Sequence, residues 1–85
     1  MGWHIAFSRA AAQQFQDLPR KDQRRLAARI DALAENPRPP GVKKLAGEDE
    51  LYRLRSGDYR LLYTVKEATL IVLVVKIGHR REVYR

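Results

Sequence analysis

Residues 51–65 read LYRLRSGDYRLLYTV and carry the clearest structural signal in the chain. Apolar and polar side chains alternate on both sides of Ser56-Gly57-Asp58, and this period of two predicts strands over 51–55 and 59–65. The three residues between them are typical of a tight turn, because glycine accepts backbone angles that other residues avoid. The segment therefore predicts an antiparallel hairpin.

The same alternation divides the side chains of the hairpin between two faces. One face is expected to pack on helices and carries Tyr52, Leu54, Tyr59, Leu61, Tyr63 and Val65. The other face carries Arg53, Arg55 and Arg60. Neighbouring guanidiniums repel one another, so this cluster is easier to explain if an anion binds there. Arginines on the exposed face of an antiparallel sheet are also ordinary, and this structural explanation stays open.

A further strand is predicted by the apolar run from Leu70 to Val75, and its pattern can extend through Lys76 to Ile77. It is apolar on both faces, which indicates a central strand covered by helices on one side. Residues 66–69 form the turn that precedes it. Gly78 predicts a sharp turn directly after the strand.

The N-terminal part predicts a strand and two helices. Trp3, Ile5 and Phe7 alternate with His4 and Ala6, as in a short strand with one buried face. Ser8 is a good N-cap for the first helix, whose inner side has helical spacing at Ala11, Ala12, Phe15 and Leu18. Pro19 marks the junction and suits the first turn of the second helix.

The second helix is amphipathic and is expected to end at Asn36-Pro37. Its inner side carries Leu26, Ile30, Leu33 and Ala34, and its outer side carries Arg20, Lys21, Arg24, Arg25 and Arg29. The tight junction at Pro19 predicts an antiparallel helical hairpin. A loop from Arg38 through Lys43 and Lys44 to the acidic residues 48–50 follows.

These elements predict an α+β fold: an N-terminal strand, an α-helical hairpin and a three-strand antiparallel meander. They would give one small sheet with the helices packed on one face. The chain has 85 residues and shows no repeat or linker, so residues 1–85 are predicted to form a single domain.

Composition narrows the function classes. Cysteine is absent, so disulfides and Cys-ligated metals are excluded. No signal peptide is recognised, and the longest apolar run is far shorter than the roughly 20 residues of a membrane span, so a cytoplasmic protein without membrane contact is expected. Glycine-rich phosphate loops and closely spaced zinc ligands are also missing from the sequence, which predicts neither metal nor cofactor.

Charge points to a polyanionic partner. The net charge is +7. Residues 1–51 hold nine Lys/Arg against seven Asp/Glu, whereas residues 52–85 hold eight against three, giving balances of +2 and +5. The predicted sheet is the more basic part, and such an excess favours nucleic acid. A merely solvated basic surface is the alternative.

The end of the chain, residues 77–84, reads IGHRREVY and gathers groups suited to phosphate chemistry. RNA can be cut when a base takes the proton of a ribose 2′-OH, whose oxygen then attacks the adjacent phosphorus. Fixed cations stabilise the charge that develops, and arginine grips two phosphate oxygens at once. Arg60 and Arg80 are the predicted clamp.

The general base is either Tyr84 or His79. Nearby positive charge favours the ionised form of a phenol, and an imidazole ordinarily transfers protons near neutral pH. The remaining predicted RNA contacts are Arg53, Arg55, Arg81, Lys43 and Lys44. The basic outer side of the second helix is either solvated, or bound to an acidic partner or to ribosomal RNA.

The chain resembles the RelE/ParE toxin superfamily of type II toxin–antitoxin systems over nearly its whole length. The matching segments are Phe15 with Leu18-Pro19, then 35–37, 44–47, 51–55, 57–63 and 77–84. The combination of Tyr59-Arg60 with the Gly-His-Arg…Val-Tyr ending is the specific part and indicates the RelE branch. By this resemblance Arg60, Arg80 and Tyr84 match catalytic positions, and Arg53 and Arg55 lie where the family has basic residues.

The resemblance implies a toxin that cuts messenger RNA in the ribosomal A site without a metal. It also implies contact with ribosomal RNA and a RelB-like antitoxin that neutralises the toxin in a hetero-oligomer, the toxin alone being monomeric. Two alternatives stay open. One is a non-catalytic inhibitor of DNA gyrase, as in the ParE branch, and the other is an RNA-binding module without activity.

Overall fold

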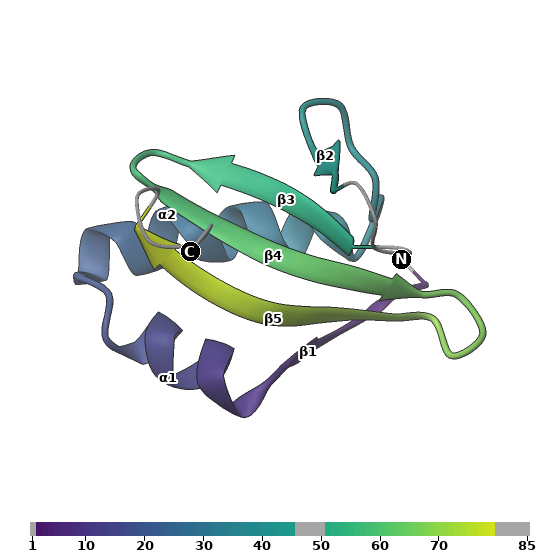
Figure 1. Cartoon of the computed structure of the whole chain (residues 1–85), viewed down its shortest axis with the longest axis horizontal. Coiled ribbons are helices and arrows are strands. Elements are labelled where there is room, and N and C mark those ends of the chain that lie inside the picture. The colour runs from purple at the N-terminus through teal and green to yellow at the C-terminus, as the bar shows by residue number, and fades with distance from the viewer. Residues whose placement is uncertain (1, 46–50, 80–85) are drawn as a thin grey trace.

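The computed structural model describes residues 2–45 and 51–79. Its elements are β1 (His4–Phe7), α1 (Arg9–Gln16), α2 (Arg20–Leu33), β2 (Lys43–Lys44), β3 (Leu51–Ser56), β4 (Tyr59–Lys66) and β5 (Ile71–His79). The five strands form one sheet in the order β1-β5-β4-β3-β2, and α2 crosses behind it (Figure 1). β1 pairs parallel to β5, whereas the other neighbours are antiparallel. The expected α+β fold is confirmed.

The core lies between the helices and one face of the sheet. Buried strand residues alternate along the chain, as the period of two predicts. The core comprises Ala11, Leu26, Ile30 and Leu33 of the helices and Tyr52, Leu54, Leu61, Tyr63, Val65, Val72, Val74 and Ile77 of the strands. We call the opposite side of the sheet the open face, because no helix of the described chain covers it in Figure 1.

The β3–β4 hairpin matches its prediction closely. Its strands pair from Leu51 with Thr64 to Ser56 with Tyr59. Gly57 takes a φ of +60°, and Asp58 is not among the residues with positive φ. A positive φ at the first central residue alone is the signature of a type II′ turn, which favours glycine there.

A β-bulge interrupts the pairing of β4 with β5. Tyr63 lies opposite Val74 and Leu62 lies opposite Lys76, so Val75 is the additional residue. An inserted residue reverses the alternation of faces beyond it. Val72 and Val74 therefore face the core before the bulge, and Ile77 faces it afterwards.

Side chains of Ser8, the N-cap of α1, and of Gln14 in α1 bind the backbone of β5 at and after the bulge. Ser8 caps α1 by accepting from the Ala11 amide at 3.0 Å, and its hydroxyl donates to the Val75 carbonyl at 2.9 Å. The Gln14 side-chain oxygen accepts from the Ile77 amide at 2.7 Å. The pairing of β1 with β5 ends at Phe7 and Val74, and these bonds satisfy backbone groups of β5 beyond that point, where β5 changes face.

The segment after α2 is anchored to the sheet by tyrosines. The Tyr63 hydroxyl donates to the Pro37 carbonyl at 2.7 Å, and the Tyr63 ring stacks on Tyr52 with a centroid separation of 5.6 Å. Burial, with Tyr52 nearby, raises the pKa of Tyr63 well above its usual range, so its hydroxyl stays protonated. Arg38 donates to the Tyr52 hydroxyl and to Glu67, each at 2.8 Å.

Several predicted boundaries are wrong by a few residues. Pro19 is the N-cap of α2 rather than a residue of its first turn, and α2 ends at Leu33, before Asn36-Pro37. Leu70 precedes β5 in a turn, with a φ of +57°. The chain does reverse between α1 and α2 (Figure 1), where Gln23 donates to the carbonyls of Phe15 and Gln16.

Three further expectations need correction. The first strand is only partly buried: Phe7 remains 37% exposed, because β1 is an edge strand, and it meets the Phe15 ring edge to face. Lys43 and Lys44 form a short edge strand rather than loop, since they pair with Arg53 and Tyr52. Gly78 makes no turn, because β5 continues through it to His79.

Candidate functional site

Basic side chains from four strands meet on the open face near the β3–β4 hairpin. Arg55 lies directly opposite Arg60, which in turn lies opposite Gly78. Arg53 is paired with Lys43 on one side and Leu62 on the other, and Leu62 is opposite Lys76. Paired residues point to the same side of a sheet. We call this set, Lys43, Arg53, Arg55, Arg60 and Lys76, the open-face cluster.

The ionisable side chains that the strands place in this cluster all carry positive charge. None of the five strands contains an Asp or Glu. Cross-strand neighbours lie about 4.5–5.5 Å apart at their Cα atoms, so the charges are crowded along the sheet. Such a face attracts a polyanion, and paired guanidiniums suit phosphate oxygens in particular.

The rim of the cluster is concave. Lys43, Arg53 and Arg55 line a pocket of about 510 Å³ together with Gly41 and Val42. Gly41 has a φ of +96°, a conformation that favours glycine, so it shapes the turn into β2. The pocket places the side chains of three predicted RNA contacts around one space.

Arg60 is partly enclosed at the open face. Its side chain is half-buried, and its Nε atom is buried. The residue opposite, Gly78, contributes no side chain to the open face. Arg53 is also half-buried, whereas Arg55 is exposed, so the members of the cluster differ in their access to solvent.

Lys76 is the member that sequence reasoning missed. Strict alternation from Val72 and Val74 would turn residue 76 toward the core, and the bulge at Val75 turns it to the open face instead. A lone lysine in an otherwise apolar strand is the signal that could have revealed it. Lys44, by contrast, is opposite Tyr52 and so points away from the open face.

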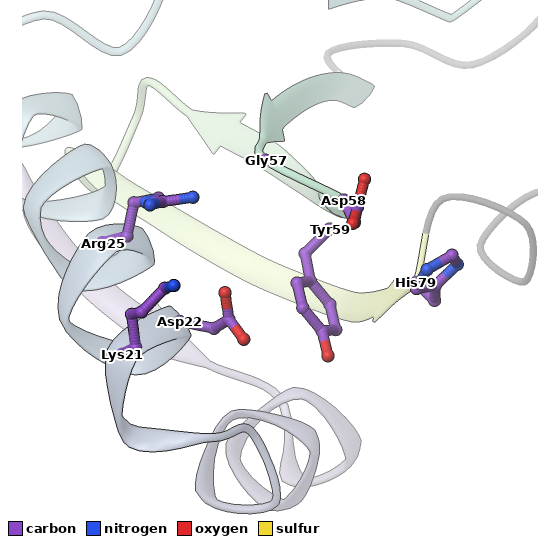
Figure 2. Close-up of a pocket in the computed structure, with 7 residues that line it drawn as sticks. All are labelled: Lys21, Asp22, Arg25, Gly57, Asp58, Tyr59 and His79. Atoms are coloured by element: carbon purple, nitrogen blue, oxygen red, sulfur yellow. The ribbon is translucent and has the colours of Figure 1, made fainter.

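His79 is separated from the open-face cluster. It pairs with Tyr59, and their rings meet edge to face at 5.8 Å on the helix side of the sheet. Figure 2 shows both residues at a pocket whose other wall is α2. This pocket measures about 540 Å³ and is lined by Lys21, Asp22, Arg25, Gly57, Asp58, Tyr59 and His79. The structure therefore does not bring His79 together with Arg60.

Other predicted site residues lie outside the described chain, namely Arg80, Arg81 and Tyr84. Within residues 2–45 and 51–79, no three His, Asp or Glu side chains gather closely enough to hold a metal ion. In the same ranges, no helix has the length and apolar character needed to cross a membrane. The described open-face cluster consists of arginine and lysine side chains, whose positive charge favours anions.

Comparison with known proteins assigns the family. Residues 5–84 match the family described as "ParE toxin of type II toxin-antitoxin system, parDE". The chain is 30% identical over its whole length to "Putative toxin RelE1" of Methanocaldococcus jannaschii, covering 98% of that protein. It is 31% identical to "mRNA interferase toxin RelE" of Escherichia coli K12, with 99% and 92% of the two chains covered.

Solved structures agree with the sequence relatives. A chain of the archaeal RelE–RelB complex from Pyrococcus horikoshii superposes with a TM-score of 0.84 at 30% identity, covering 96% of this chain and 99% of that one. The intact E. coli RelBE complex gives 0.81 at 28% identity, covering 91% and 95%. The chain belongs to the ParE toxin family of type II toxin–antitoxin systems. Within this family it is a RelE-like toxin.

Proposed function

We propose that this toxin is a ribosome-dependent endoribonuclease that stops translation by cutting messenger RNA. The observation that carries the proposal is the open-face cluster on strands without a single acidic residue. The curated relative from E. coli, 31% identical, is named an mRNA interferase, which supports the same substrate. A message threaded across the open face would meet guanidiniums from three neighbouring strand positions.

The proposed reaction needs a base, a phosphate clamp and an acid, and no metal. Arg60 and Arg80 would bind the scissile phosphate as the ribose 2′-oxygen attacks and the negative charge grows. Arg53, Arg55 and Arg81 would hold neighbouring phosphates, with Lys43 at the rim. An acid supplied by the complex of toxin and ribosome would protonate the 5′-oxygen as it leaves.

Tyr84 is our proposed general base. His79 was the alternative, and its position on the helix side of the sheet makes it a poor partner for Arg60. Tyr63 is excluded as a proton carrier, because burial raises its pKa and its hydroxyl donates to a backbone carbonyl. A phenol among several cations ionises more readily, which suits Tyr84 to the role.

The proposal includes two partners. Arg24, Arg25 and Arg29 are exposed on α2, and with Lys44 they would grip ribosomal RNA through salt-dependent contacts. The solved relatives from E. coli and P. horikoshii are complexes of RelE with RelB, so we propose a RelB-like antitoxin for this toxin. A protein that acts on ribosomes and is held by such an antitoxin would work in the cytoplasm.

One alternative has an observation in its favour, because the matching family is named after ParE. A gyrase inhibitor would leave messages intact. Translation in vitro followed by primer extension on the message separates the two functions. The proposed nuclease gives discrete cuts within codons on translating ribosomes and does not impair supercoiling by gyrase. An intact message together with blocked supercoiling would overturn the proposal.

A further inference from the structure

The pocket between α2 and the β3–β4 hairpin is separate from the open-face cluster. Tyr59 precedes Arg60 along β4, so the two side chains point to opposite faces of the sheet. His79 follows Gly78 in the same way on β5. The pocket therefore lies on the helix side of the sheet, whereas Arg60 lies on the open face. Both are at the same end of the sheet.

Four charged side chains line the pocket, two basic and two acidic. Lys21 and Arg25 are one helical turn apart on α2, while Asp22 and Asp58 contribute carboxylates. No hydrogen bond or ion pair engages any of these four side chains in the described structure. Figure 2 shows all four around the same space, with Asp22 directed toward the Tyr59 ring.

This charge pattern selects among ligands. A site for a simple anion would not include two carboxylates, and a site for a cation would not include two basic residues. The ligand must therefore combine an anionic group with hydrogen-bond donors. Its volume must suit about 540 Å³, which is within the range of pockets for small organic ligands.

The aromatic pair adds a third requirement. The Tyr59 and His79 rings lie at 77° to each other, so neither covers the other by parallel stacking. Unpaired RNA bases stack on such rings and bind through hydrogen bonds at their edges. A nucleotide has all three features: a flat base, N–H donors at the base edge and a phosphate.

The backbone of the hairpin is shaped to this pocket. A Cβ atom at position 57 would lie 3.1 Å from the Arg25 Nη1 atom, and Gly57 holds a φ of +60°. Glycine therefore allows the turn to approach α2 while the Arg25 guanidinium remains beside it. Any side chain at this position would displace the guanidinium and strain the turn.

We propose that this pocket binds one unpaired RNA nucleotide. The base would stack on Tyr59, its N–H donors would bind Asp22 or Asp58, and its phosphate would bind Lys21 and Arg25. This site rests on the proposed action on RNA and extends it to a second face of the sheet. The nucleotide comes either from the message beyond the cut or from ribosomal RNA.

The first test uses 5′-GMP as the probe, because its base offers two adjacent N–H donors to a carboxylate. The full-length protein is titrated with GMP, guanosine and inorganic phosphate, and NMR follows the Tyr59 and His79 rings. GMP is expected to bind at least about 10-fold more tightly than either fragment, since only GMP engages both ends of the pocket. Phosphate binding as tightly as GMP would reduce the pocket to an anion site and overturn the proposal.

Variants connect the binding to named residues. Lys21→Gln and Arg25→Gln each remove an exposed charge and should lower the affinity for GMP about 10-fold. Tyr59→Leu removes the ring on which the base would stack and should lower it by about 10-fold or more. Arg9→Gln removes an exposed cation from α1 and is the matched control, with unchanged GMP binding expected. Should Tyr59→Leu fail to fold, the two charge variants still test the site. Equal GMP affinity in both charge variants and the parent would contradict the proposal.

Ribosomes identify the source of the nucleotide. If ribosomal RNA supplies it, Lys21→Gln loses affinity for vacant ribosomes; Arg25→Gln is not used here, because Arg25 is also a proposed contact to ribosomal RNA. If the message supplies it, the loss appears only on programmed ribosomes. Either result supports the site, whereas a loss confined to antitoxin binding would make it a protein contact and overturn the proposal. Arg60→Ala should still bind GMP, so failure of the nuclease proposal and failure of this site give different results.

Discussion

Arg60→Ala should reduce cleavage of the message by about 10²-fold or more and abolish growth inhibition. In the proposed mechanism Arg60 binds the scissile phosphate and stabilises charge that grows in the transition state, and losing one such donor has an effect of this order. Arg80→Ala should act in the same way. The rate is measured in single turnover on ribosomes that hold a defined message.

The open face provides a matched control for this experiment. Lys66 is on the same strand and the same side as Arg60, opposite Ile71, but six residues away. At about 3.3 Å per residue the two positions are roughly 20 Å apart. Lys66→Ala should therefore keep nearly full activity, although it removes the same charge. Because Arg60 is half-buried, circular dichroism is used to check that the Arg60→Ala protein remains folded. Arg60→Lys keeps the charge but loses the guanidinium that binds two phosphate oxygens, so its cleavage rate should be intermediate. Full toxicity of well-expressed Arg60→Ala and Arg80→Ala would refute the clamp.

Tyr84→Phe should lower single-turnover cleavage by roughly 10²–10⁴-fold, because phenylalanine keeps the ring and removes only the oxygen that would carry the proton. A residue that merely stacks on a base would tolerate the change. Binding of the variant to programmed ribosomes should stay close to that of the parent, since the ring is retained.

His79→Gln is the comparison for this prediction. His79 is on the helix side of the sheet, so its loss should weaken RNA binding more than the rate of the chemical step at saturation. The expected order of chemical rates is parent, then His79→Gln, then Tyr84→Phe. A larger loss in His79→Gln than in Tyr84→Phe would transfer the role of base to His79.

Local patterns in the sequence were sufficient for the hairpin and its arginine face. Both strands of 51–65 alternate strictly, and a glycine stands where the turn requires positive φ, so neighbouring residues alone determine which side chains share a face. The N-cap at Ser8 and the apolar side of α2 were predicted for the same reason. The parallel pairing of β1 with β5 depends on partners far apart in the chain, and its edge position leaves Phe7 partly exposed.

The bulge explains why the rest of the site was harder to predict. One additional residue at Val75 turns Lys76 to the open face and His79 to the helix side. No residue near the bulge is unusual, since the hydrogen bonds that hold it come from Ser8 and Gln14, more than 60 residues earlier. Strand β2 was missed for a similar reason, because two lysines become a strand only by pairing with β3.

The most direct test of the proposed function compares cleavage of one message in two states, free in solution and on ribosomes stalled with an empty A site. The described part of the site offers cations, and its strands carry neither Asp nor Glu, so in our proposal the ribosome holds the 2′-oxygen in line with the phosphorus. Orientation of this kind is worth several powers of ten in rate. We expect cleavage on the ribosome to be at least about 10³-fold faster, with Arg60→Ala inactive in both states. Equal rates in the two states would show that the protein's own residues suffice and would contradict the proposed dependence on the ribosome.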